Sequence, residues 1–196
     1  MEIFPTAYFG NVAYFKSLTA AVDPFIEAHE HFIKQSLRSR CEILGANGPQ
    51  TLSIPVIRKN GSKTPVHEVL LDDHKRWRKE HWRSIESAYA SSPYFEFYDK
   101  EVRMMIEFDT DRLIDLNMNI TRSILDLLEI NNEFGMTEAY QMSDITTDYR
   151  PFDFNLPDQK RYIQVFGDDF VPNLSVLDLL FCEGPMARNI LLEKDH

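Results

Sequence analysis

HKRWRKEHWRSIESAYASSPYFEFY, residues 74–98, carries the clearest helical pattern of the chain and decides how the rest is arranged. Apolar and aromatic side chains recur there every three to four residues, which places them on one stripe of an amphipathic helix. Asp72 or Asp73 can supply an N-cap carboxylate. We therefore expect the other elements to pack against this stripe, which consists of Trp77, His81, Ile85 and Ala88.

The same helix begins with a run of cations, at the end where the helix dipole is already positive. The cations can form a solvated face that is paired with acidic neighbours, as most charge runs do. Alternatively they form an anion site, in which the dipole and the cations hold a phosphate while Trp77 or Trp82 stacks on a base or sugar. The cations are Lys75, Arg76, Arg78, Lys79 and Arg83.

Length and composition indicate a folded domain. The chain has 196 residues, of which 43% are hydrophobic and 12% aromatic, and this is enough for one sizeable core. We expect residues 1–196 to form a single α/β domain whose C-terminal half is mainly helical. The sequence shows neither a signal-peptide pattern nor an apolar run of about 18 residues, so we expect a cytoplasmic protein without membrane insertion.

Cysteine content and motifs argue against a disulfide framework and against the common cofactor sites. Cys41 and Cys182 are the two cysteines, and they lie too far apart in sequence to suggest a metal-binding pair. The Walker loop, G-x-G-x-x-G, G-x-S-x-G and H-E-x-x-H do not occur. We therefore expect free buried thiols, no metal site and no bound cofactor.

Charge is divided unevenly along the chain. Residues 1–83 carry 12 Lys and Arg against 9 Asp and Glu, a net charge of +3, whereas residues 84–196 carry 9 against 22, a net charge of −13. The acidic pI near 5.0 disfavours general nucleic-acid binding. A local basic cleft in the N-terminal half is still compatible with an anionic small molecule or with the end of an RNA.

The first half alternates strand and helix patterns, and glycines mark its turns. A glycine-rich turn at residues 45–49 is typical of a hairpin. The fold class is therefore α/β, with a mixed sheet formed mainly by the N-terminal half and packed with helices from the rest of the chain. The predicted elements are strands at 2–7 and 22–28 on either side of a helix at 12–18, a hairpin at 41–57 and an extended segment at 66–71.

The second half has the pattern of helices joined by loops. Ser92 indicates the start of a new helix at Pro93, and Ser175 with Asp178 matches a capping box. Residues 143–158 show no periodicity, so this loop is either a lid or a contact surface. The remaining predicted elements are helices at 110–118 and 120–130, a strand at 135–141 and a final helix from Pro185.

Chemically versatile side chains cluster just after the second predicted strand. Alternation in an extended segment would point His29 and His31 in the same direction. An imidazole with a pKa near about 6.5 is suited to general base catalysis, and no third metal ligand is evident nearby. Lys34, Arg38 and Arg40 follow within seven residues and can clamp a phosphate.

Four segments together resemble the WbqC-like protein family. They are TAYFGNVAYFKSL at 6–18, HEHFIKQSLRSRCEI at 29–43 with GANGPQTLSIPV at 45–56, the helical stretch at 77–98, and PNLSVLDLLFCEGP at 172–185. The resemblance implies a cytoplasmic role in the biosynthesis of bacterial O-antigen and other surface polysaccharides, on nucleotide-activated or modified sugars. The positions that match the family pattern are His29, Lys34, Arg38, Arg40, Asn47, Trp77, His81, Tyr89, Asn173 and Asp178.

Two functions follow as hypotheses. The first is a transferase that acts on a nucleotide sugar or a related anionic substrate by acyl or aminoacyl transfer, with an RNA-linked group as one candidate donor. The second is a non-catalytic scaffold of a polysaccharide-synthesis complex, whose contact surface includes residues 149–154. In the first hypothesis the general base is His29 or His81, and the substrate-binding residues are Lys34, Arg38, Arg40, Asn47 and Trp77.

His81 also fits a second interpretation, because it shares the apolar stripe of the predicted helix with Trp77 and Ile85. A histidine at such a position is often a hydrogen-bonded core residue. To act as a base, His81 must keep one ring nitrogen free toward Arg38 and Arg40.

Overall fold

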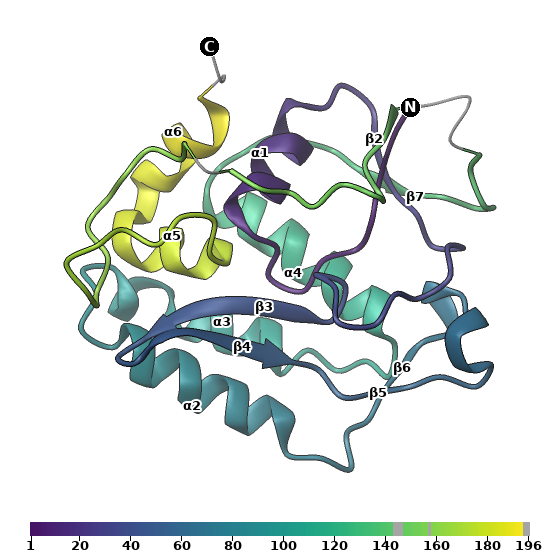
Figure 1. Ribbon diagram of the computed structural model, residues 1–196, viewed down its shortest axis with the longest axis horizontal. Helices are drawn as coiled ribbons and strands as arrows, with labels where there is room; N and C mark the ends of the chain where they lie inside the picture. The colour runs from purple at the N-terminus through teal and green to yellow at the C-terminus, as the bar shows by residue number, and fades with distance from the viewer. Residues whose placement is uncertain (143–146, 157, 194–196) are drawn as a thin grey trace.

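A four-stranded parallel sheet forms the upper right of the molecule in Figure 1. The computed structural model describes residues 1–142, 147–156 and 158–193. In space the strands follow the order β7–β2–β1–β8, so the chain is an α/β protein as predicted. The strands are β1 (Glu2–Phe4), β2 (Pro24–Ile26), β7 (Gly135–Met136) and β8 (Thr147–Asp148).

Helix α1 (Val12–Ala20) connects β1 to β2 and completes a strand–helix–strand unit. Ile3 and Phe4 point to opposite faces of β1 and are both fully buried, as expected for a parallel strand covered on both sides. The Asn11 side chain caps α1 by accepting a hydrogen bond from the Tyr14 backbone N–H at 2.9 Å. The sequence therefore fixes the start of the crossover helix locally.

The predicted hairpin is present and lies against α2 (Trp77–Tyr89). Strands β3 (Arg40–Gly45) and β4 (Gly48–Ser53) pair in antiparallel register, and Gly48 has a φ of 103°, a conformation that favours glycine. Residues 66–71 are only partly extended, because a 3₁₀ turn precedes a short strand. The short elements here are β5 (Val56–Ile57), β6 (Leu70–Leu71) and the turns Gly61–Lys63 and Val66–Glu68.

The stripe predicted for α2 is confirmed, since Trp77, His81 and Ile85 are all buried. The predicted N-cap is wrong. The Asp73 carboxylate accepts hydrogen bonds from Trp77 Nε1 at 2.8 Å and from Arg78 Nε at 3.0 Å, and no side chain caps the first turn. The carboxylate thus binds side chains of the helix instead of its backbone.

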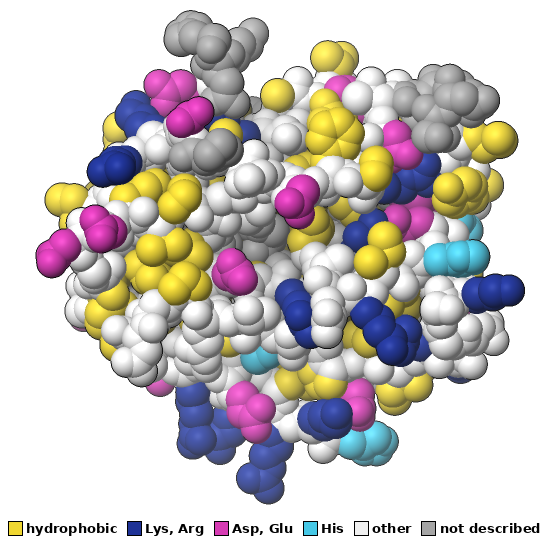
Figure 2. Space-filling view, viewed as in Figure 1, with side chains coloured by type: hydrophobic (Ala, Val, Ile, Leu, Met, Phe, Trp, Pro, Cys, Tyr) yellow, Lys and Arg dark blue, Asp and Glu magenta, His cyan; other side chains and the backbone are white. Residues whose placement is uncertain are grey.

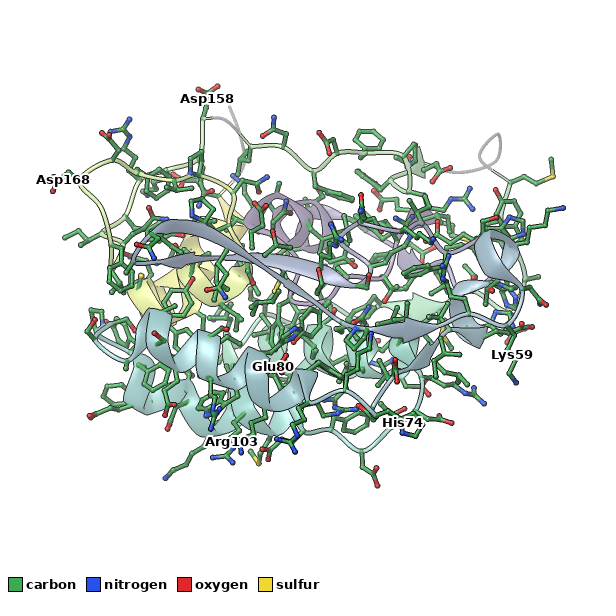
Figure 3. All side chains as sticks on the ribbon, turned by 60° about the horizontal axis from the view of Figure 1, so that its bottom comes forward. Lys59, His74, Glu80, Arg103, Asp158 and Asp168 are labelled. Atoms are coloured by element: carbon green, nitrogen blue, oxygen red, sulfur yellow. The ribbon has the colours of Figure 1, made fainter. Side chains whose placement is uncertain are left out.

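The other helices follow the predicted order with different boundaries. The two helices predicted at 110–118 and 120–130 form one continuous helix, α4, because Asn119 does not interrupt it. Figure 3 shows α2 and α3 at the front, with Arg103 projecting outward from α3. The helices are α3 (Phe95–Ile106), α4 (Leu113–Leu127), α5 (Val176–Glu183) and α6 (Ala187–Leu192), with a 3₁₀ turn at Gly184–Met186.

Strand β8 lies within the segment that was predicted to be a loop at 143–158. It pairs with β1 through Glu2–Thr147 and Ile3–Asp148. The segment beyond it remains anchored, because Tyr149 stacks on Phe4 with ring centroids 4.2 Å apart. Residues 143–146 and 157 of the predicted loop lie outside the described residues.

Cys41 and Cys182 are buried free thiols, and burial raises the pKa of each. Among the helices that the structure describes, none combines the length and the apolar character needed to cross a lipid bilayer.

Candidate functional site

A pocket lies beyond the carboxyl ends of the parallel strands, where open α/β sheets usually bind ligands. Its volume is about 640 Å³. On this side of the molecule, Figure 2 shows cationic, acidic and histidine side chains close to one another. The lining residues are His29, Glu30, His31, Ile33, Tyr140, Asp148, Arg150 and Pro151.

The fully buried carboxylate of Glu27 holds the walls of this pocket together. It accepts hydrogen bonds from the His29 backbone N–H at 2.9 Å and from Thr137 Oγ1 at 2.8 Å. It also accepts from the Gln141 backbone N–H at 2.9 Å and from Arg150 Nη1 at 3.2 Å. One buried anion therefore fixes the segments that follow β2, β7 and β8 relative to one another.

The Arg150 guanidinium forms ion pairs with two carboxylates, those of Glu27 and Asp148. Its Nε and Nη2 atoms donate to Asp148 at 2.8 Å each, and these bonds lower the pKa of Asp148. The guanidinium also lies 4.7 Å from the ring centroid of Tyr140. Because Tyr140 is 57% exposed, its ring offers the pocket a flat apolar surface with a polar tip.

His29 lies half-buried in the pocket wall with its ring 4.5 Å from that of His67, measured between centroids. Backbone hydrogen bonds bring the two together, because the His67 N–H donates to the Ala28 carbonyl at 2.9 Å. The same carbonyl lies 2.9 Å from His67 Nδ1, which fixes the His67 ring. Within the described ranges, no three His, Cys, Asp or Glu side chains are grouped as a metal site would require.

Arg38 is buried in a bidentate ion pair with Glu30. Its Nε and Nη2 atoms donate to the two Glu30 oxygens at 2.7 and 2.6 Å. Burial raises the pKa of Glu30, and the hydrogen bonds from Arg38 oppose that rise. Asn117 of α4 donates to the Arg38 carbonyl at 2.8 Å. Arg38 is therefore part of the wall, with its charge already neutralised.

A second pocket of about 400 Å³ adjoins the first across the Glu30–Arg38 pair, because Glu30 lines the first pocket and Arg38 the second. Asp148, Arg150 and Pro151 line the first pocket, and Phe152 and Asp153, next in the chain, line the second. We call the two pockets together the groove. Arg40 lines the second pocket, half-buried, and has no ion-pair partner among the residues that the structure describes. The other residues that line this pocket include Asn11, Gln35, Ser36, Glu42, Thr51, Asp153 and Asn173.

The remaining substrate-binding residues predicted from sequence are not brought together. Lys34 is exposed on the loop between the two pockets, and Asn47 is exposed at the tip of the β3–β4 hairpin. Trp77 is 2% exposed, and the Arg78 guanidinium lies 4.6 Å from its ring centroid. The Trp77 ring therefore has no open face on which a base or sugar could stack.

His81 lies in the core, 5% exposed. Its Nδ1 atom lies 2.8 Å from the Tyr8 hydroxyl, and the ring also hydrogen-bonds the backbone of Ser53. Burial lowers the pKa of His81 to about 4, so the ring is neutral at pH 7. His81 lines neither pocket, and of the two predicted bases only His29 faces the groove.

Sequence reasoning did not single out several residues that shape the pocket. For Glu27 the available signal was alternation in the extended segment, which places its carboxylate on the same face as His29 and His31. Arg150 lies in a segment without periodicity, and His67 in one predicted to be extended, so neither gave a local signal. These missed residues are Glu27, His67, Tyr140, Asp148 and Arg150.

Comparison with known proteins agrees with three of the four segments noted in the sequence, whereas the fourth, at 172–185, lies beyond the residues that the family model matches. The family model described as "WbqC-like protein family" matches residues 6–154. The chain is 28% identical over 209 residues to the uncharacterized protein Rv1507c of Mycobacterium tuberculosis, covering 89% of this chain and 90% of the relative. No solved structure matches the chain. With three quarters of its length matched, the chain belongs to the WbqC-like protein family.

Proposed function

We propose that the groove binds a nucleotide sugar or a related anionic substrate and transfers an acyl or aminoacyl group to it, in the biosynthesis of bacterial surface polysaccharide such as O-antigen. The observation that carries this proposal is the position of His29. Its half-exposed imidazole lines a pocket of about 640 Å³ on a loop held by the buried Glu27 carboxylate. In this proposal the protein works in the cytoplasm, where nucleotide-activated sugars are made.

His29 acts as the general base in this mechanism. It accepts a proton from an amine or hydroxyl of the substrate while the nitrogen or oxygen forms a bond to the acyl carbon of an activated ester or thioester. The bond from the acyl carbon to its leaving group then breaks, and the proton on His29 passes to that group. An aminoacyl ester on the end of an RNA is one donor of this class.

The anionic part of the substrate binds in the second pocket, where Arg40 is half-buried without an ion-pair partner among the described residues. A guanidinium in such a site can bind phosphate oxygens in a bidentate manner. Tyr140 replaces Trp77 as the aromatic surface for the sugar, because Tyr140 is exposed beside the first pocket. Lys34, on the loop between the pockets, adds positive charge at the rim.

Ligand-induced stabilisation tests the proposal directly. We expect at least one nucleotide sugar to raise the melting temperature, since a ligand at about 100 times its Kd adds about 2.7 kcal/mol. Arg40→Gln should weaken this effect. His29→Gln should retain it and reduce turnover by about 10²–10⁴-fold. His74→Gln is the matched control, because His74 projects from the loop before α2 (Figure 3). Absence of stabilisation by every anionic ligand and donor tested would contradict the proposal.

A non-catalytic scaffold is the second candidate, and exposed aromatic surface favours it. Phe152 is 55% exposed in the segment that follows β8. If the scaffold is correct, polysaccharide output in cells will be unchanged by His29→Gln and lost with Phe152→Ser. The transferase predicts loss of output with His29→Gln, and this response is the discriminating one because Phe152 also lines the second pocket.

A further inference from the structure

Helix α3 carries apolar side chains on its outer surface that neither the core nor the groove uses. Phe97 and Met104 are 71% and 63% exposed, and Phe108, just beyond the end of the helix, is 37% exposed. Together with Glu101 they recur at spacings of four, three and four residues. This is the spacing of a seam that packs against another helix.

The seam borders a hollow between α3 and α4. Its volume is about 460 Å³. Met104 is exposed there and has a flexible side chain that can adapt to different partners, whereas Met105 is buried in the core. We call this hollow the α3–α4 groove. Its apolar residues are Met104, Met105, Phe108 and Leu127, and its polar residues are Glu101, Asn119, Ser123 and Asp126.

Charge indicates what kind of helix fits there. Both charged residues that line the α3–α4 groove, Glu101 and Asp126, are acidic. Residues 96–126 carry eight Asp and Glu against four Lys and Arg, a net charge of −4. A second copy of the chain would bring this acidic surface against itself, which is unfavourable. A cationic surface is complementary.

We propose that the α3–α4 groove binds a cationic amphipathic helix of a partner protein. Apolar residues of that helix at positions i, i+3 or i+4, and i+7 cover Met104 and Phe108, while its Lys and Arg side chains face Glu101 and Asp126. This interaction is independent of the groove that contains His29, because the two sites share no residue.

Fluorescence anisotropy of a labelled synthetic peptide tests the proposal on the full chain. The peptide has about 18 residues, five helical turns, with leucines along one stripe and lysines or arginines beside them. A scrambled peptide of the same composition controls for net attraction to an acidic protein. We expect the amphipathic peptide to bind at least about tenfold more tightly, and Met104→Ser with Phe97→Ser to weaken it about 10–100-fold.

Matched substitutions separate the α3–α4 groove from the rest of the surface. Ile163→Ser removes a side chain that is 88% exposed elsewhere and should leave binding unchanged. Glu101→Gln with Asp126→Asn should weaken binding, whereas Asp168→Asn on a distant loop (Figure 3) should not. Circular dichroism checks that each variant is folded.

Three outcomes would overturn the proposal. Equal binding of the scrambled peptide would reduce the interaction to net charge, and binding insensitive to Met104→Ser would place it elsewhere. The third outcome is a dimer in analytical ultracentrifugation that Met104→Ser dissociates and the peptide does not displace. It would make a second copy the occupant of the α3–α4 groove.

Discussion

Glu30 and Arg38 form a buried ion pair, so replacing one partner leaves the other charge buried without a counterion and lowers the free energy of unfolding. Both are nearly inaccessible to solvent, and their two hydrogen bonds replace the water that each has lost. Glu30→Gln should therefore destabilise the fold by about 3–5 kcal/mol, because Arg38 stays buried without a counterion. Urea denaturation measures this change.

The control for Glu30→Gln is Glu107→Gln, which breaks the exposed pair between Arg103 and Glu107 on α3. Solvent screens that pair, so its loss should cost less than about 1 kcal/mol. Equal effects of the two substitutions would show that the wall between the two pockets does not depend on the buried pair.

His81 makes stability depend on pH. Burial lowers its pKa from the ordinary 6.5 of a histidine to about 4, so between these values the unfolded chain binds a proton that the folded chain does not. Its contribution is complete above about pH 6.5 and is lost progressively as the pH falls toward 4. By linkage, the loss is on the order of 3 kcal/mol.

Urea unfolding of wild type and His81→Gln at pH 7, 6 and 5 checks this prediction. The variant loses hydrogen bonds to Tyr8 and Ser53, so its absolute stability will fall and the informative quantity is the slope with pH. The difference in unfolding free energy between the two proteins should shrink from pH 7 to pH 5. A constant difference would mean that His81 titrates normally.

The junction of α5 with the following turn depends on a glycine. Gly184 has a φ of 54°, and a Cβ atom there would overlap the Tyr94 ring. Gly184→Ala should therefore destabilise by more than the roughly 1 kcal/mol of backbone strain alone. Gly61→Ala provides the comparison, since Gly61 has a φ of 58° and nothing within 4 Å of the added atom. Thermal unfolding of both variants distinguishes steric overlap from strain.

Sequence patterns predicted those elements whose periodicity spans several turns or whose caps are local. The buried stripe of α2 is one example, and the cap of α5 is another, since Ser175 accepts a hydrogen bond from the Leu177 backbone N–H. The capping box is only half formed, because the Asp178 carboxylate binds side chains of Tyr89, Tyr162 and Gln164 instead of the backbone. Strand β8 could not be found in this way, because two residues, Thr147 and Asp148, are too short for an alternation. Its pairing with β1 is a tertiary effect.

The same contrast holds for the pocket. Histidines and cations lie close together in sequence at residues 29–40, and this clustering predicted a binding site there. In the structure His29 faces the first pocket, Arg38 is paired in the wall and Arg40 lies in the second pocket. This arrangement depends on Glu30 and on segments more than 100 residues away. Spacing along the chain carries no information about such partners.

Across the molecule, the groove and the α3–α4 groove should act independently. Their lining residues do not overlap, and substitutions at distant sites without shared partners usually add. We expect Met104→Ser to leave ligand-induced stabilisation at the groove unchanged, and Arg40→Gln to leave peptide affinity unchanged. Measuring both quantities in the single and double variants tests this, and a coupling above about 0.5 kcal/mol would reveal communication between the two sites.

Strand β1 lies between β2 and β8, which are synthesised at different times. One edge of β1 pairs with β2, which ends at Ile26, whereas the other pairs with β8 at residues 147–148. At a translation rate of about 5–20 residues per second, the second partner follows the first by about 6–24 s. A nascent chain that has paired β1 with β2 therefore leaves the other edge of Glu2–Phe4 unpaired throughout that interval, and an unpaired edge is a site where other chains can pair.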